Sequence, residues 1–224
     1  MELLNFSETS KTYCTVFFLS LLFSFFGSYW IDRLYKKVQS SDLLSFPEHI
    51  TSRARLRKPL LFLLLLLCLG KAWGTAALPA LYYITVAIAV LSFVTVTDFE
   101  QYVIFDSMLL PLAVCGICYT LHMHLPLWEH FAAGLGGGLL FFILTLLTKG
   151  AIGGGDIKLI AALGLWLGVR LLLSVIAYGF MAGGVAALFL LVTKQKKRSD
   201  YFAYGPYFAL SGIGVLLGWI RMLF

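Results

Sequence analysis

The chain has 224 residues, of which 60% are hydrophobic and 12% charged, and its mean hydropathy is +0.90. This composition excludes a soluble globular domain, which could not bury so much apolar surface, and it indicates a polytopic membrane protein. The net charge of +6 comes from Lys and Arg gathered in a few loops, as is usual in membrane proteins, so nucleic-acid binding is not expected.

Apolar runs follow one another along the chain, most of them near the length that crosses a bilayer. They predict an all-α protein with about eight transmembrane helices, forming a single membrane domain over residues 1–224. The first run follows Glu2 and Glu8 rather than basic residues, so it is expected to be a retained span and not a signal peptide. The predicted spans lie near residues 13–31, 59–74, 78–97, 107–121, 130–148, 157–168, 171–192 and 203–223.

The basic residues predict how these helices are oriented. Segment 32–58 holds seven Lys and Arg residues and segment 193–200 holds four. With eight spans, both segments lie on the same side of the membrane as the connections 98–106 and 149–156. The positive-inside rule places that side in the cytoplasm. Segment 32–58 is therefore expected to be a basic cytoplasmic loop, and both termini are expected to be external.

Four carboxylates stand at the predicted cytoplasmic ends of helices. Asp98, Glu100 and Asp106 occur in "VTDFEQYVIFDSMLLP", and Asp156 occurs in "GGGDIKLIAALGLWLG". A carboxylate within membrane-spanning sequence is costly and indicates function. Two carboxylates held close share one proton, which provides an acid and a base for activating water against a peptide carbonyl. The simpler alternative is that the aspartates only cap helices.

The glycines ahead of Asp156 favour a functional interpretation over a cap, because a cap does not require three of them. Gly153, Gly154 and Gly155 would let an extended peptide lie close to the carboxylates, since they carry no side chain.

Cysteine and histidine give no metal site. The four cysteines lie in apolar runs, where they are expected to pack as small hydrophobic residues. His122, His124 and His130 fall on the predicted external side, in "HMHLPLWEH", and are expected to form a solvated or interfacial loop.

The acidic blocks resemble those of the type IV prepilin peptidases, which are membrane aspartic proteases of the GxGD kind. "GGGDIKLIAALGLWLG" is similar to the family's G-x-G-D block, "TDFEQYVIFDSMLLP" to its first-aspartate block, and "YGPYFALSGI" to the opening of its last span. The resemblance implies that Asp98 and Asp156 are the catalytic pair. Glu100, Asp106 and Lys158 match the same blocks without an implied catalytic role. Gly153, Gly154, Gly155 and Lys158 are expected to lie beside the substrate.

The implied activity is that of an endopeptidase that removes the leader peptide of prepilins or pseudopilins at the cytoplasmic face of a bacterial inner membrane. Many members of this family carry two C-x-x-C pairs, associated with zinc, between the first two spans, but segment 32–58 contains no cysteine. The chain is thus expected to be a short form, of the kind that commonly serves competence in Gram-positive bacteria. Peptide cleavage would need no cofactor, and S-adenosylmethionine would be needed only if the N-methyltransferase activity of the larger members were retained.

A small proton-coupled membrane transporter is the alternative function. It would have its aspartates near the bilayer midplane and interrupted helices in two repeated halves. The chain shows no internal repeat and its aspartates stand at helix ends. The peptidase interpretation is therefore preferred, with prepilin precursors and the lipid bilayer as the expected partners.

Overall fold

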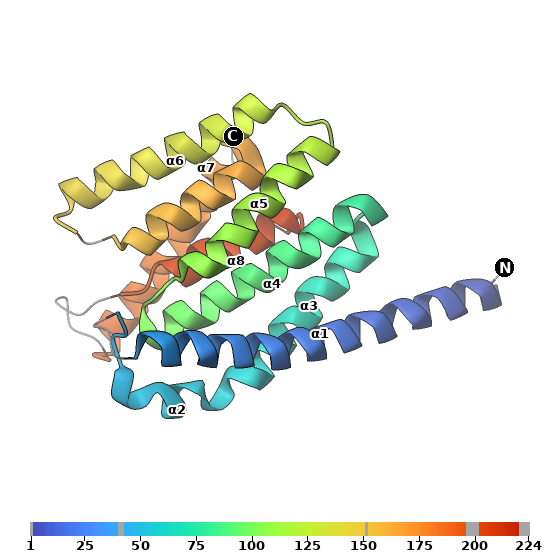
Figure 1. Cartoon of the computed structure of the whole chain (residues 1–224), viewed down its shortest axis with the longest axis horizontal. Helices are drawn as coiled ribbons and strands as arrows, with labels where there is room; N and C mark the ends of the chain where they lie inside the picture. Colours follow the sequence, from blue (N-terminus) through green and yellow to red (C-terminus); the bar gives the residue numbers. More distant parts are fainter. Residues whose placement is uncertain (1, 40–42, 151, 196–201, 220–224) are drawn as a thin grey trace.

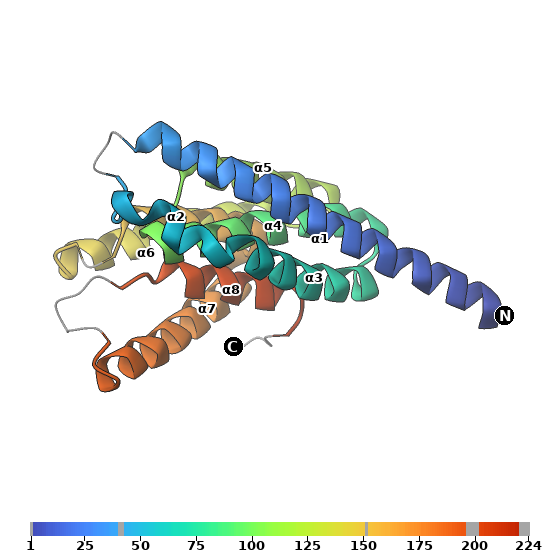
Figure 2. The same ribbon diagram turned by 90° about the horizontal axis from the view of Figure 1, so that it is seen from below.

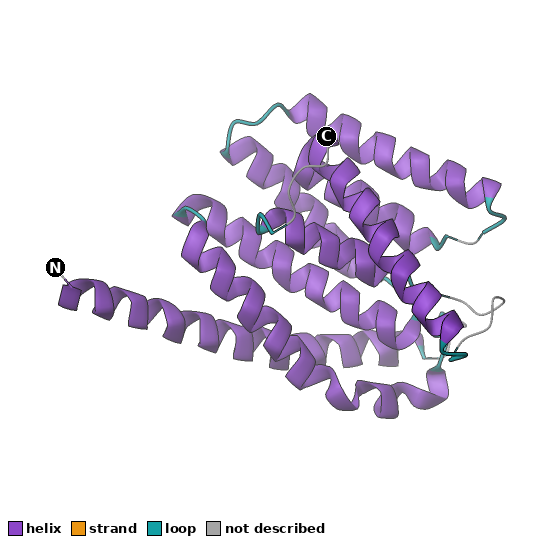
Figure 3. Ribbon diagram, turned by 180° about the vertical axis from the view of Figure 1, so that it is seen from behind, coloured by secondary structure: helices purple, strands orange, loops and turns teal. Residues whose placement is uncertain are grey.

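The computed structural model describes residues 2–39, 43–150, 152–195 and 202–219, with side chains from residue 12 onward. Over these ranges the chain consists of helices and loops and contains no strand, which confirms the predicted all-α class (Figures 1 and 3). The longer helices are α1 (Glu2–Val38), α3 (Arg57–Thr75), α4 (Leu78–Gln101), α5 (Asp106–His122), α6 (Leu127–Leu147), α7 (Gly154–Val192) and α8 (Gly205–Leu216).

The long helices are apolar enough to account for a membrane protein. Among the described residues, four helical stretches have the length and composition to cross a bilayer: Thr12–Val38, Leu78–Gln101, Leu127–Leu147 and Gly154–Val192. Two shorter apolar helices, α5 and α8, accompany them. These helices support the predicted polytopic membrane character.

Helix α4 lies at the centre of the bundle. It packs against α3, α5 and α8, and 78% of its apolar stretch is buried inside the structure, against 33% or less for the other three membrane-length stretches. The sequence of α4 suits this position because nearly every residue from Ala87 to Val94 is apolar and buried. The helix starts with Pro79 in its first turn and ends at Tyr102, whose backbone is left-handed.

The segment predicted as a long basic loop, residues 32–58, is mostly helical. Helix α1 continues to Val38, and the short helices η1 (Pro47–His49), α2 (Ile50–Arg53) and η2 (Ala54–Leu56) lead into α3. The prediction placed the end of the first helix too early because it followed only the apolar run. Polar and basic residues extend α1 by about two turns, and α1 packs chiefly against α3 (Figure 1).

Helix α7 is broken at Gly168, whose φ of 68° and ψ of −178° are not helical. Glycine adopts a positive φ at little cost, so this residue allows the chain to change direction inside a continuous apolar run. Both parts of α7 reach α8: a Cβ on Gly205 would lie 3.0 Å from Asp156, and one on Gly183 would lie 2.8 Å from Tyr204. The second part, drawn in orange, therefore returns toward the end of the bundle where α7 begins (Figure 2). The predicted helices 157–168 and 171–192 correspond to these two parts.

Candidate active site

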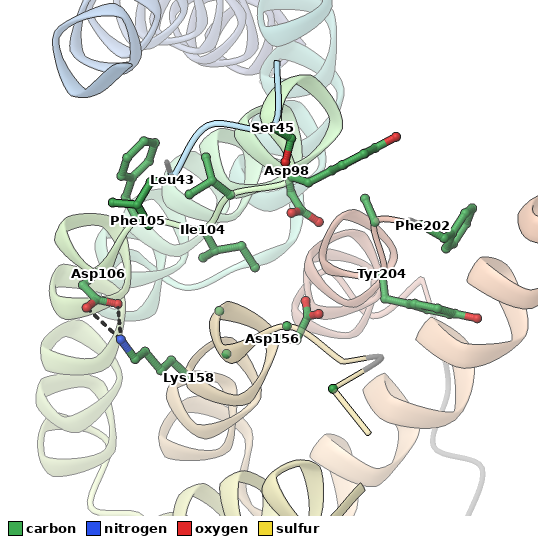
Figure 4. A pocket seen from close by; sticks show the side chains of 17 residues that line it. Leu43, Ser45, Asp98, Ile104, Phe105, Asp106, Asp156, Lys158, Phe202 and Tyr204 are labelled. Carbon is green, nitrogen blue, oxygen red and sulfur yellow. Dashed lines mark hydrogen bonds and ion pairs between the residues drawn. The ribbon is translucent and has the colours of Figure 1, made fainter. Parts of the chain in front are cut away.

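The two predicted catalytic aspartates are brought together by the ends of three helices. Asp98 lies in the last turn of α4, Asp156 lies in the first turn of α7, and α8 begins beside them at Gly205. A Cβ placed on Gly205 would lie 2.6 Å from Asp98 Oδ2 and 3.0 Å from Asp156 Oδ1. The two oxygens are thus no farther apart than the sum of these distances. Both residues are more than 90% buried, and Figure 4 shows their carboxylates facing one space.

The hydrogen bonds of the pair leave one oxygen unused. The backbone N–H of Gly205 faces the Asp98 carboxylate, and the backbone N–H of Gly153 faces that of Asp156. Within the described part of the chain, Oδ1 of Asp156 is buried and has no hydrogen-bond partner. Buried polar atoms are nearly always paired, so an unpaired carboxylate oxygen calls for an explanation. Capping of α7 explains the contact with Gly153 and does not explain Oδ1.

A cavity of about 610 Å³ opens beside the two aspartates (Figure 4). Among the described residues of its lining, the charged ones are Asp98, Asp106, Asp156 and Lys158, so this described part carries an excess of negative charge when the aspartates are ionised. Such a lining attracts a basic ligand. The described residues that line the cavity are Leu43, Ser45, Asp98, Tyr102, Val103, Ile104, Phe105, Asp106, Gly150, Gly153, Gly154, Gly155, Asp156, Lys158, Phe202, Ala203 and Tyr204.

The other predicted polar residues divide into two groups. Lys158 Nζ lies 2.8 Å from both carboxylate oxygens of Asp106, and this exposed ion pair stands at the edge of the cavity. Glu100 points elsewhere, because its carboxylate accepts hydrogen bonds from Arg57 and Tyr35. Of the four carboxylates predicted at helix ends, Asp98, Asp106 and Asp156 line the cavity, whereas Glu100 lies in the same last turn of α4 as Asp98 and does not line it.

The three glycines line the cavity but differ in their surroundings. Gly153 precedes α7 as its N-cap, and Gly154 and Gly155 are the first two residues of the helix. A Cβ on Gly155 would lie 2.9 Å from the Cβ of Ile104, so this position is closed by packing. A Cβ on Gly154 would meet no atom within 4 Å. Only part of the glycine run is thus open to a peptide.

Two features of the site were not predicted from the sequence. Gly205 contacts both aspartates, although "YGPYFALSGI" was recognised only as the opening of a helix. Leu43 and Ser45 form part of the cavity lining from a segment far away in the sequence. Glycine followed by proline at a helix start is the signal that could have singled out Gly205.

The histidines do not gather around this cavity. His130, expected in a solvated loop, is instead a buried residue of α6 whose Nδ1 lies 3.1 Å from the carbonyl oxygen of Leu165. Across the described ranges, no group of three or more His, Cys, Asp or Glu residues is arranged to hold a metal ion. The residues at the cavity that could hold a ligand are therefore the carboxylates, Lys158 and the exposed backbone.

The fold and the cavity define a helical membrane protein with a buried aspartate pair at one end of its bundle. Comparison with known proteins narrows this class, since residues 85–188 match the type IV leader peptidase family. This part of the chain, which holds both aspartates and the glycine run, is similar to that family, and the predicted resemblance is confirmed.

Curated relatives carry the name prepilin leader peptidase/N-methyltransferase. The chain is 31% identical over 170 residues to the protein of Aeromonas salmonicida strain A449, an alignment covering 73% of this chain and 54% of the relative. For the Aeromonas hydrophila protein the identity is 30% over 161 residues, with 69% and 51% covered. For that of Neisseria gonorrhoeae it is 37% over 124 residues, with 53% and 42% covered. The chain thus spans about half the length of these relatives. No solved structure matches it significantly.

Proposed function

We propose that the chain is a membrane-embedded aspartic endopeptidase that cleaves the leader peptide of prepilin or pseudopilin-like precursors at the cytoplasmic face. The observation that carries this proposal is the buried, unpartnered Oδ1 of Asp156, which lies beside Asp98 at the cavity. The family match and the names of the relatives support the reaction and the substrate class.

The aspartate pair would act as one acid–base unit. With one proton between them, the ionised carboxylate takes a proton from a water molecule as the water oxygen attacks the scissile carbonyl carbon. The protonated carboxyl gives its proton to the carbonyl oxygen, which forms a tetrahedral intermediate. The intermediate collapses when the first carboxyl passes the proton that it took from water to the leaving nitrogen and the C–N bond breaks. The second carboxylate takes a proton from a hydroxyl of the intermediate, which restores the pair. Burial of both residues suits this step, because charges interact more strongly where water is excluded.

The cavity also suits the proposed substrate. Gly154 would present backbone without a side chain to an extended peptide. Asp98 and Asp156 would favour a basic leader, because the nearby charge of Asp106 is already compensated by Lys158. The basic residues of segment 32–58 would repel a basic leader electrostatically. The negative charge of the carboxylates in the cavity would compensate this repulsion where the leader binds.

The proposed topology has eight spans, with both termini external and the cavity on the cytoplasmic side of a bacterial inner membrane. The reversal at Gly168 supports this count, because it makes two spans of α7. Reporter fusions within 43–56 and 193–195 should read as cytoplasmic, and fusions at either terminus should read as external. A cytoplasmic C-terminus would refute the eight-span arrangement.

We treat residues 1–224 as one peptidase domain that works without a cofactor. The loop 32–58 contains no cysteine, so chelators are expected to leave cleavage intact. N-methylation, which appears in the names of the relatives, would require S-adenosylmethionine, and here it is expected to be weak or absent. Mass spectrometry of the mature product's N-terminus decides between a free and a methylated amine.

Co-expression with a pilin-like precursor tests the proposed activity. The wild-type chain should convert the precursor to a faster-migrating form, whereas Asp98→Asn and Asp156→Asn should not. Glu129→Gln, at the start of α6, is the control and should cleave normally. Cleavage by either aspartate variant, at normal protein levels, would refute the proposal. Proton uptake into vesicles that depends on the aspartates, without any cleavage, would favour the transporter alternative.

A further inference from the structure

Segment 43–46 is fastened to the end of α4 by one buried side chain, that of Gln101. The backbone N–H of Phe46 donates to Gln101 Oε1 at 2.9 Å, and Gln101 Nε2 donates to the carbonyl oxygen of Phe46 at 3.1 Å. The N–H of Ser45 also approaches the carbonyl oxygen of Gln101, at 3.4 Å. The amide of Gln101 therefore pairs with Phe46 as a neighbouring strand would, through one donor and one acceptor.

The four residues of this segment alternate between the protein interior and the cavity. Leu44 is 5% exposed and belongs to the hydrophobic core, and Phe46 packs between Arg53 and Tyr102. Leu43 and Ser45 line the cavity, and Leu43 is 58% exposed. Segment 43–46 thus presents every second side chain to the cavity.

Further contacts hold Phe46 in place. The Arg53 guanidinium carbon lies 3.9 Å from the centre of the Phe46 ring, and Arg53 Nη2 donates to the carbonyl oxygen of Phe99 at 3.1 Å. These contacts hold Phe46 against the end of α4. In Figure 4, Leu43 and Ser45 lie above the space between the aspartates, while Asp156 and Lys158 lie below it. The cavity consequently has a wall that is bonded to α4 through Gln101 and lies across the cavity from the glycine-rich start of α7.

We propose that segment 43–46 is a substrate-binding wall along which the basic leader lies extended, and that Gln101 is a positioning residue for this wall. The proposal rests on the proposed function and adds the surface that selects the substrate. Leu43 contacts the leader side chains, and the amide of Gln101 keeps the wall at a fixed distance from Asp98. A leader that lies along this wall would meet the side chains of Leu43 and Ser45, which line the cavity.

Leu43 provides a test that does not depend on folding, since its side chain is largely exposed. Purified full-length protein is assayed with two synthetic peptides, one with a lysine-containing leader and one with a neutral leader, each joined to the same apolar segment. Leu43→Lys should raise KM for the basic peptide by about threefold or more, and Leu43→Glu should lower it. The neutral peptide should change little. Leu56→Lys is the matched control, because Leu56 is 62% exposed and does not line the cavity.

Gln101→Met tests the positioning role. It keeps the length of the side chain and removes both hydrogen bonds to Phe46. KM should rise by about fivefold to tenfold while kcat stays within about twofold, because the loss concerns binding and not the acid–base pair. Thr148→Val, which removes an exposed hydrogen bond away from the cavity, should change neither value.

The results separate this proposal from the proposed function. If the wild-type chain cleaves the basic peptide and Asp98→Asn does not, the proposed function stands. The wall is then refuted if Leu43→Lys and Leu56→Lys shift KM equally, or if Gln101→Met leaves KM unchanged. If no peptide is cleaved by the wild-type chain, the proposed function fails. The same two peptides, carrying a fluorescent label, are then titrated with the variants. A larger Kd of the basic peptide for Leu43→Lys than for Leu56→Lys supports the wall, and equal Kd values refute it.

Discussion

Arg57 and Glu100 form a buried ion pair that joins the start of α3 to the last turn of α4. Arg57 Nη2 lies 2.6 Å from Glu100 Oε2, and Arg57 Nε also donates to both carboxylate oxygens. The hydroxyl of Tyr35 donates to Glu100 at 3.0 Å, and Arg57 pairs in addition with Asp32. The turn that carries Asp98 is thereby tied to α1 and α3, through a residue that does not reach the cavity.

Removing one partner of this ion pair should destabilise the fold. Glu100→Leu leaves the guanidinium buried with only Asp32 as a charged partner, and this should lower the free energy of unfolding by about 3–5 kcal/mol. Heat-induced unfolding in detergent and the amount of protein in membranes measure the effect. Glu48→Leu is the control, because Glu48 is exposed. The double variant Arg57→Met, Glu100→Leu should regain most of the stability and cleave normally per folded molecule. Lost cleavage in a stable double variant would give the pair a direct role in the reaction.

Gly205 should not tolerate a side chain. A Cβ there would lie 2.6 Å from Asp98 Oδ2, 2.9 Å from Ile104 Cδ1 and 3.0 Å from Asp156 Oδ1. The added methyl group of Gly205→Ala must push both carboxylates aside. Misplacing catalytic groups by about 1 Å can cost about 100-fold in rate, so the cleavage rate should fall by about that factor. The rate is measured on folded protein, against Gly184→Ala, since a Cβ on Gly184 meets no atom within 4 Å. A normal rate for Gly205→Ala would mean that the reaction does not need the observed positions of the two carboxylates.

Gly154 and Gly155 should respond differently to substitution. Gly155→Ala places a Cβ 2.9 Å from that of Ile104, and such overpacking costs about 1–3 kcal/mol of stability. Gly154→Val should leave stability near that of the wild type and lower cleavage, because its side chain would occupy space at the cavity. Melting temperature and kcat/KM of the two variants make the comparison. Full cleavage by Gly154→Val would show that no substrate backbone passes close to this residue.

The helices and the aspartate pair could be predicted from the sequence because local signals determine them. Apolar runs have the length of membrane helices, and Gly-Gly-Gly-Asp stands out in a chain with few charges. Helical periodicity also separates the carboxylates of α4. Residues two apart, such as Asp98 and Glu100, point to opposite sides of a helix, so they could not both face one cavity.

The rest of the site depends on contacts between segments far apart in sequence. Segment 43–46 is held at the cavity in part by Gln101, 55 residues from Phe46, which binds its backbone. The partner of Glu100 is Arg57, which the sequence analysis counted only as one of the charges of a cytoplasmic loop. The sequence around these residues shows no pattern of hydrophobicity or turn residues that signals either contact. Neither contact could therefore be predicted before the fold was known.

The aspartate pair makes the most direct prediction, because two groups that act as one unit cannot replace one another. Asp98→Asn and Asp156→Asn should each abolish cleavage, and the double variant should be little worse than either single variant, since such effects are strongly non-additive. Asp106→Asn should keep substantial activity, because Asp106 is engaged with Lys158 in an exposed ion pair. All four variants are measured on purified protein with one peptide substrate.

The pH dependence follows from the same sharing of a proton. At low pH both carboxyls are protonated and neither can accept a proton from water, so the rate rises with pH on the acidic side. At high pH both are ionised and neither can protonate the carbonyl oxygen, so the rate falls again. The plot of kcat/KM against pH should therefore be bell-shaped, with two apparent pKa values that belong to the pair. A rate that keeps rising with pH would require only a base, and it would refute the assignment of an acid and a base to Asp98 and Asp156.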